Sequence, residues 1–183
     1  MFSAIPRGRI YSGGMSQPGA LAGRTAIVVT VSDRCFAGTQ TDLSGPALVR
    51  LLSEAGAEIV EEITLPDEQE ELTAALRLAA MRAELVVTTG GTGLAARDIT
   101  PEATLAVSTR LVPGIAELIR EEGARHTRFA ALGRGVCVVA GTSLILNLPG
   151  SVNGAESSLR VVLPLLPHAL DLLAGQTEHP AKR

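Results

Sequence analysis

The chain has 183 residues, 46% of them hydrophobic, and a formal net charge of −3 at pH 7. This length suits one domain with a substantial core. Aromatic residues make up only 2% and tryptophan is absent, so both the positive charge and the stacking surfaces that nucleic-acid binding needs are lacking. The apolar runs are far shorter than the roughly 18 residues of a membrane span, and no signal peptide is recognisable. We therefore expect a cytoplasmic protein without a nucleic-acid or membrane partner.

The two ends of the chain differ from the rest in composition. Residues 1–23 are rich in Gly, Ser and Pro without periodicity, which predicts a flexible N-terminal arm. Residues 176–183 are predicted to form a frayed C-terminal tail. A single domain is therefore expected over residues 24–175.

Predicted strands and helices alternate through the first half of this domain. The β-branched run at 25–31 is typical of a strand that is buried on both faces. Leucines at helical spacing follow over 48–55, and a weaker strand is predicted at 58–64. Asp67 and Glu70 resemble a capping box at the start of the next helix.

The alternation continues in the second half. A strand is predicted at 84–89, and Thr100 is expected to cap the helix that follows. A further helix is predicted to end at Gly123, and two strands are expected around a turn at Gly141. The last helix, about 153–174, must be kinked or divided by its two prolines. This pattern predicts an α/β fold with a mostly parallel central sheet.

Three polar stretches each follow a predicted strand directly. They are "SDR" with the loop "CFAGTQTDLSG", then "GGTGLAARDITPE", and finally "NLPGS". Because the carboxyl ends of parallel strands meet at one edge of a sheet, the three stretches are expected to line one cleft.

The glycine-rich stretches have the character of anion sites. Glycines at 90, 91 and 93 allow close approach of the backbone and successive N–H donors, and the helix after Thr100 adds its dipole. "NLPGS" repeats the arrangement, with a turn at 149–150 and Ser151 before the last helix. We expect a ligand, or a pair of ligands, with phosphates. The alternative is that these glycines only form tight turns.

Asp42 and Asp98 are unexpected beside anion sites unless a divalent cation lies between them and the phosphates. Mg²⁺ is commonly held by one or two carboxylates together with phosphate oxygens. The structural alternatives are helix capping or pairing with Arg97 for Asp98, and an Asx-turn for Asp42.

Other well-known motifs do not fit. The chain has no P-loop, and the G-x-G-x-x-A match at 91–96 is not followed at once by a helix, which disfavours a dinucleotide dehydrogenase. Cys35 and Cys137 have no metal-binding spacing and are expected to be small, partly buried hydrophobes.

Together these motifs resemble a known family. "TVSDR", the aspartate of "TQTDLSGP", "TTGGTGLAARDITPEAT" and "LILNLPGS" are similar to the molybdopterin adenylyltransferases of the MogA and MoaB type, which are related to the G domain of gephyrin. The resemblance spans about residues 25–173. It implies a three-layer α/β/α domain that forms homotrimers, binds Mg²⁺, ATP and molybdopterin, and transfers AMP onto the terminal phosphate of the pterin with release of pyrophosphate. A molybdenum-insertion protein would then receive the product.

The resemblance also carries roles onto matching residues. Asp42 and Asp98 match two acids required for activity and would hold Mg²⁺ through the phosphates. The nucleotide- and phosphate-binding positions are Ser32, Gly90, Gly91, Thr92, Gly93 and Thr100. The positions of the turn for the pterin phosphate are Asn147, Pro149, Gly150 and Ser151. The alternative is a pterin-binding or scaffold protein of the same fold with little or no catalysis, because fold does not imply activity.

One position departs from the family pattern. Family members often have a basic residue shortly before the "LILNLPG" strand, where this chain has Ala140. A charge that would help to hold the pterin phosphate is therefore expected to be missing, and Arg34, Arg97 and Arg134 are candidates to replace it.

Overall fold

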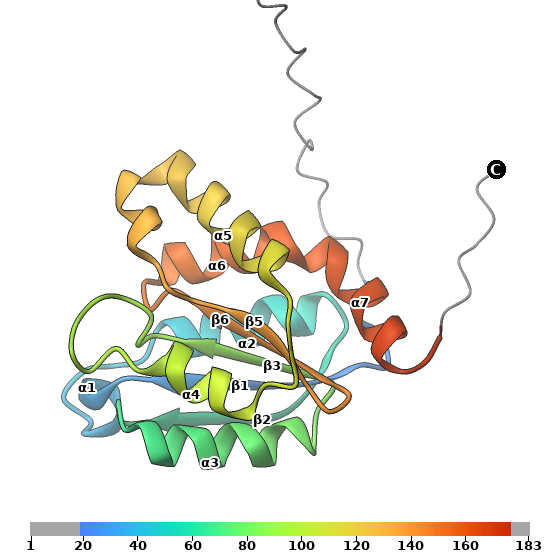
Figure 1. Ribbon diagram of the computed structural model, residues 1–183, viewed down its shortest axis with the longest axis horizontal. Coiled ribbons are helices and arrows are strands. Elements are labelled where there is room, and N and C mark those ends of the chain that lie inside the picture. Colours follow the sequence, from blue (N-terminus) through green and yellow to red (C-terminus); the bar gives the residue numbers. More distant parts are fainter. Residues whose placement is uncertain (1–18, 177–183) are drawn as a thin grey trace, which may run out of the picture.

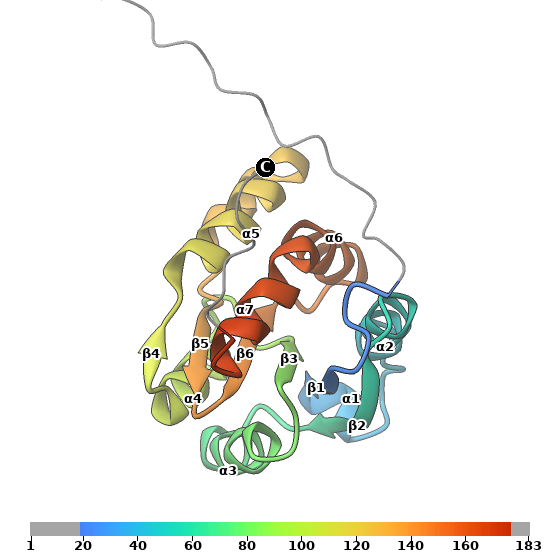
Figure 2. The ribbon, with the colours of Figure 1, turned by 90° about the vertical axis from the view of Figure 1, so that its right-hand side faces the viewer.

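The computed structural model describes residues 19–176, so residues 1–18 of the expected arm and 177–183 of the expected tail lie outside the described part. Its six strands form one sheet in the order β2-β1-β3-β6-β5-β4. Helices cover both faces of this sheet, which gives three layers (Figures 1 and 2). The predicted α/β/α architecture is confirmed.

The sheet is mostly parallel. Its parallel strands are, in sheet order, β2 (Glu58–Leu65), β1 (Thr25–Val31), β3 (Leu85–Thr89) and β6 (Ser143–Leu148). β5 (Cys137–Ala140) pairs antiparallel with β6 across the predicted hairpin. β4 (Arg110–Leu111) is a short edge strand that the sequence pattern does not reveal.

Two hydrophobic clusters bind the layers together. In β1, Ala26 and Val28 belong to the cluster on one face, whereas Ile27 and Val29 belong to the cluster on the other, so the strand is apolar throughout. The helices over the first face are α2 (Ser44–Glu54), α5 (Pro113–His126), α6 (Val152–Val162) and α7 (Leu166–Leu173). Those over the second face are α3 (Gln69–Ala80) and α4 (Thr100–Val107).

Three short helical segments complete the fold. They are α1 (Asp33–Phe36), η1 (Arg128–Leu132) and η2 (Leu163–Leu165). η2 contains the first of the two prolines and separates α6 from α7, which confirms the predicted division of the last helix. Within residues 19–176, no helix is long and apolar enough to span a bilayer.

Three local expectations were wrong. Residues 19–23 do not belong to a flexible arm, because Leu21 is fully buried and its N–H donates to the Ala55 carbonyl at 2.7 Å. α5 does not end at Gly123 but continues to His126. A Cβ at Gly123 would lie 2.7 Å from the Cβ of Ala130, so this glycine permits close packing against η1 instead of ending the helix. Asp67 does not cap α3, whose N-cap residue makes no side-chain hydrogen bond.

Candidate functional site

The three polar stretches begin at one end of the sheet, as predicted, but no residue of the first stretch, 32–45, lines the cavity that the other two share. In the parallel register Thr30 pairs with Thr89, and Thr89 pairs with Leu148, so the segments after β1, β3 and β6 begin side by side. The Gly90 N–H donates to the Leu148 carbonyl at 3.2 Å, and Thr89 Oγ1 donates to the Pro149 carbonyl at 2.8 Å.

The first glycines of the Gly90–Ile99 segment, here called the glycine loop, are required by its backbone path. Gly90 has φ +98°, and a Cβ there would lie 2.2 Å from the Val31 carbonyl oxygen. Gly91 has φ +61°, and a Cβ there would lie 2.4 Å from Thr100 Oγ1 and 3.1 Å from Asp67 Oδ1. The tight-turn interpretation therefore holds for both residues, which leaves open whether the loop also binds an anion.

The donors of the glycine loop favour an anion. The backbone N–H groups of Gly91, Thr92 and Gly93 have no hydrogen-bond acceptor among the described residues. Unpaired successive N–H groups form a concave site for phosphate or carboxylate oxygens. An anionic ligand at this point would satisfy all three.

Arg134 holds the carbonyl side of the same loop. Its Nε donates to the Gly93 carbonyl at 2.6 Å, its Nη2 to the Asp98 carbonyl at 2.5 Å, and its backbone N–H to the Thr92 carbonyl at 2.9 Å. Its guanidinium also forms an ion pair with Glu102, and this hydrogen bond lowers the pKa of the Glu102 carboxyl. Arg134 is therefore engaged in shaping the loop.

Thr100 also acts on the loop, although it does not cap the helix as expected. It is the first residue of α4, and the N-cap residue Ile99 makes no side-chain hydrogen bond. The Thr100 hydroxyl instead donates to the Gly90 carbonyl at 2.9 Å. The threonine thus fixes the start of the loop.

Asp98 closes the far end of the glycine loop. Its Oδ2 accepts the Ala95 N–H at 2.7 Å, and a Cβ at Gly93 would lie 2.8 Å from the same oxygen. Its Oδ1 accepts no hydrogen bond from the described residues. Both structural alternatives for Asp98 are wrong, because it neither caps α4 nor pairs with Arg97.

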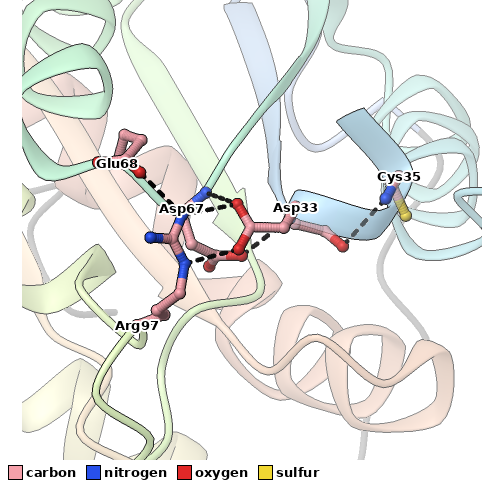
Figure 3. Close-up of polar contacts among 6 residues, drawn as sticks. Asp33, Cys35, Asp67, Glu68 and Arg97 are labelled. Carbon is pink, nitrogen blue, oxygen red and sulfur yellow. Dashed lines mark hydrogen bonds and ion pairs between the residues drawn. The ribbon is translucent and has the colours of Figure 1, made fainter. Parts of the chain in front are cut away.

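Arg97 binds acidic side chains of the neighbouring connections (Figure 3). Its Nε donates to Asp33 Oδ2 at 2.6 Å, and its Nη2 donates to Asp33 Oδ1 at 2.8 Å and to Glu68 Oε1 at 2.9 Å. Asp33 and Asp67 each accept the backbone N–H of the other, at 3.0 and 2.9 Å. We call Arg97, Asp33 and Asp67 the loop latch, because they tie the glycine loop to α1 and to the β2–α3 connection.

The two carboxylates of the latch have opposite pKa shifts. The hydrogen bond from Arg97 lowers the pKa of Asp33, whereas burial raises the pKa of Asp67. Asp67 is a site residue that sequence reasoning missed, because its position before a helix resembled a capping box. A Cβ at Gly91 would lie 3.1 Å from Asp67 Oδ1, and this proximity depends on the tertiary fold.

Asp42 occupies a separate position, where α2 begins. Its Oδ1 accepts hydrogen bonds from the Ser44 N–H at 2.9 Å, the Ser44 hydroxyl at 3.1 Å and the Gly45 N–H at 3.1 Å. Its Oδ2 accepts the Thr30 hydroxyl at 2.5 Å. The Asx-turn alternative is thus present in the structure. No hydrogen bond within residues 19–176 joins Asp42 to the glycine loop.

In the turn at 147–151, here called the second turn, Ser151 caps a helix and Asn147 is a buried structural residue. Ser151 caps α6 as expected, since its Oγ accepts the Gly154 N–H at 3.3 Å. Asn147 is only 2% exposed. Its Nδ2 donates to Thr88 Oγ1 at 3.0 Å and to Thr104 Oγ1 at 2.9 Å, and its Oδ1 accepts the Val136 N–H at 3.2 Å. The Asn147 amide therefore ties β6 to β3 and α4, and its role toward a phosphate stays a prediction.

Asn147→Ala is expected to lower the free energy of unfolding by about 2–4 kcal/mol, because it leaves several buried polar groups without partners. Urea denaturation measures this loss. Asn153→Ala, an exposed position in the first turn of α6, is the control and should change stability little. A loss below about 0.5 kcal/mol, the size of an ordinary surface substitution, would show that the amide is not a structural tie.

A cavity of about 630 Å³ opens beside both turns. Thr92 and Gly93 line it from the glycine loop, Pro149 and Ser151 from the second turn, and α5 and η1 form its opposite wall. Nothing in the sequence pattern places α5 and η1 at the site, because their contribution depends on how they pack against α6.

Ser32, Arg34 and Ala140 are the remaining positions that the sequence singled out, and none of them lines the cavity. Ser32 Oγ accepts the Cys35 N–H at 3.3 Å and so caps α1. Arg34, also on α1, is exposed. Ala140 pairs with Ser143 at the hairpin, at the sheet edge opposite to the glycine loop. A basic residue at 140 could not reach the loop, so the expected loss of a phosphate-binding charge there is wrong.

The described residues contain no group of three or more His, Cys, Asp or Glu side chains arranged to hold a metal ion. A Mg²⁺ bound largely by phosphate oxygens needs only one or two carboxylates. The Asp98 Oδ1 atom is suited to such a contact, because no described residue donates a hydrogen bond to it.

The fold and this site define an open α/β domain with a mostly parallel sheet, in which unpaired amides, a helix N-terminus and a cavity lie together at the carboxyl ends of the parallel strands. The chain belongs to the family described as "Probable molybdopterin binding domain", which matches residues 27–168.

Named relatives agree with this assignment. The chain is 41% identical to the molybdenum cofactor synthesis protein cinnamon of Drosophila melanogaster over 80% of its own length, but it spans only 25% of that protein. It is 39% identical to a molybdopterin adenylyltransferase of Helicobacter pylori strain J99, covering 81% of this chain and 86% of the relative. The crystal structure of the molybdopterin biosynthesis enzyme MoaB from Thermus thermophilus is similar with a TM-score of 0.78 and 47% identity, covering 87% of this chain and 99% of that one.

Proposed function

We propose that this protein is a molybdopterin adenylyltransferase, which uses ATP to adenylylate molybdopterin and releases pyrophosphate. The observation that carries the proposal is the row of unpaired N–H groups at Gly91, Thr92 and Gly93, beside a cavity that reaches the N-terminus of α6. Two phosphate-binding elements that share one cavity suit a donor and an acceptor that both carry phosphates. The name of the Helicobacter pylori relative supports the same reaction.

In this reaction an oxygen of the pterin phosphate attacks the α-phosphorus of ATP. A new oxygen–phosphorus bond forms, and the bond from the α-phosphorus to the bridging oxygen breaks, so pyrophosphate leaves with its electron pair. The amides of the glycine loop orient the triphosphate and stabilise the charge that develops on it. The turn at 149–151 orients the acceptor. No covalent intermediate with the protein is needed, so catalysis rests on positioning and charge neutralisation.

Mg²⁺ would neutralise the charge of the triphosphate and of the leaving pyrophosphate. Asp98 would hold it through Oδ1. Asp42 already accepts four hydrogen bonds, three of them on Oδ1, so its remaining capacity lies on Oδ2. Its first role is to hold the start of α2, and a role toward Mg²⁺ would use that remaining lone pair.

We propose in addition that the protein works in the cytoplasm as a homotrimer and passes its product to a molybdenum-insertion protein. An exposed edge strand and exposed apolar side chains support an interface between subunits, among them Leu105, Leu111, Phe129 and Leu132. Sedimentation equilibrium of the full chain tests the oligomeric state.

Pyrophosphate release tests the activity. The protein is mixed with ATP, Mg²⁺ and freshly prepared molybdopterin, and each component is omitted in turn. The proposal predicts release only when all are present, and loss of release on adding EDTA. Molybdopterin binding that is independent of ATP and yields no pyrophosphate would instead identify a non-catalytic pterin-binding protein of this fold.

Arg97→Gln is expected to raise KM for ATP about 3- to 10-fold with a smaller change in kcat. The variant loses the hydrogen bonds from the glycine loop to Asp33 and Glu68, so ATP must order that part of the loop on binding. The unfolding midpoint should change little, since the Arg97–Asp33 ion pair is exposed. Steady-state kinetics with varied ATP at saturating molybdopterin measure KM for ATP and kcat separately.

The matched control for this variant is Arg82→Gln. Arg82 is similarly exposed and forms an ion pair with Glu61 away from the site. Because Arg97 lowers the pKa of Asp33, the Arg97–Asp33 ion pair is present at pH 7 and is lost only as the pH falls through that lowered value. Equal KM values for the two variants would contradict a positioning role for Arg97.

A further inference from the structure

Among the described residues, the lining of the cavity beside the two turns has basic but no acidic side chains. Of the described side chains that line it, only Arg120 and His126 are ionisable, and none is a carboxylate. His126 Nε2 lies 3.1 Å from Glu122 Oε1, so it has an acidic neighbour outside the cavity. The Arg120 guanidinium is therefore the charge that an anion entering this cavity would meet.

Arg120 is also weakly engaged by the protein. Its one hydrogen bond runs from Nη1 to the Gly135 carbonyl at 3.2 Å, and it forms no ion pair within residues 19–176. Two of the other arginines at this edge are occupied: Arg97 binds Asp33 and Glu68, and Arg134 binds the glycine loop and Glu102. A half-buried guanidinium with several free donors is suited to binding phosphate oxygens through paired hydrogen bonds.

The geometry points to Arg120 as the residue that selects an acceptor with a terminal phosphate, by binding the anionic oxygens of that group from the α5 side of the cavity. This assignment rests on the proposed function for the identity of the acceptor. The same cavity is lined by Thr92, Gly93 and Ser151, so a phosphate held by Arg120 would share this cavity with the glycine loop and the turn at 149–151. Arg120 supplies the positive charge that position 140, at the opposite edge, could not.

The test compares Arg120→Gln and Arg120→Lys with wild type. Loss of charge-assisted hydrogen bonds to one phosphate is expected to raise the dissociation constant for molybdopterin about 10- to 100-fold. Lysine keeps the positive charge but cannot donate the paired hydrogen bonds of a guanidinium, so Arg120→Lys should recover part of the lost affinity. KM for ATP should stay within about 3-fold, because that change corresponds to less than one lost hydrogen bond. Arg125→Gln, an exposed arginine on the same helix that does not line the cavity, is the control.

Inorganic phosphate is the second probe, because it does not depend on the proposed reaction. Its binding is followed by NMR shifts of the Thr92, Gly93 and Gly154 amides in folded wild type and Arg120→Gln. Weaker phosphate binding in the variant supports the assignment, even if wild type releases no pyrophosphate and the proposed function fails. Equal phosphate or molybdopterin binding by the two proteins overturns the role of Arg120 and leaves the proposed function standing.

Discussion

Asp98→Asn is expected to lower the rate of adenylyl transfer by about 100- to 1,000-fold, because the site loses a charge that stabilises the transferring phosphoryl group. Asparagine can still accept the Ala95 N–H, so the loop keeps its shape. Binding of molybdopterin should therefore change much less than turnover. Single-turnover pyrophosphate release measures the rate, and equilibrium ultrafiltration measures the binding.

Glu71→Gln is the control for this variant, since Glu71 is an exposed carboxylate on α3 away from the glycine loop. It should leave both rate and binding unchanged. If Asp98→Asn weakened molybdopterin binding as much as it slowed turnover, the role of Asp98 toward Mg²⁺ would be contradicted.

Gly90→Ala is expected to lower the free energy of unfolding by about 3 kcal/mol or more, because two costs add. The first is the positive φ of +98°, which L-residues rarely adopt, and the second is the clash of the new Cβ with the Val31 carbonyl at 2.2 Å. The clash involves backbone on a central strand, which has no alternative rotamer. Denaturant unfolding of both proteins measures the difference.

Gly141→Ala separates these two costs. Gly141 has φ +64°, but no atom lies within 4 Å of a Cβ built there. Only the backbone cost of about 1–2 kcal/mol should remain at this hairpin position. Equal losses at positions 90 and 141 would show that the close approach of Gly90 to β1 does not constrain the loop.

The strands and the position of the site were predictable because each depended on local patterns. The apolar run of β1 reflects burial on both faces, and the meeting of "GGTG" with "NLPGS" follows from parallel strand direction alone. Burial also raises the pKa of Cys137 to about 12, which confirms this thiol as a small hydrophobe.

Sequence reasoning failed where a residue serves a partner that is distant along the chain. Leu21 lies in a segment of turn-forming residues, yet it packs beside the end of α2. Thr100 resembles a helix cap, but its hydroxyl binds the glycine loop. Arg134 comes from a loop without any motif and holds three carbonyls of another loop. Each of these roles depends on tertiary contacts that a local pattern does not contain.

The central claim is that this site joins AMP to molybdopterin. The most direct test uses ATP labelled at the α-phosphate, with molybdopterin and Mg²⁺, and follows the label after separation of the products. We predict that the label appears in the pterin fraction in a one-to-one ratio with pyrophosphate, and that Asp98→Asn nearly abolishes this transfer. Label in free AMP, or label that stays in ATP while molybdopterin is bound, would contradict the claim.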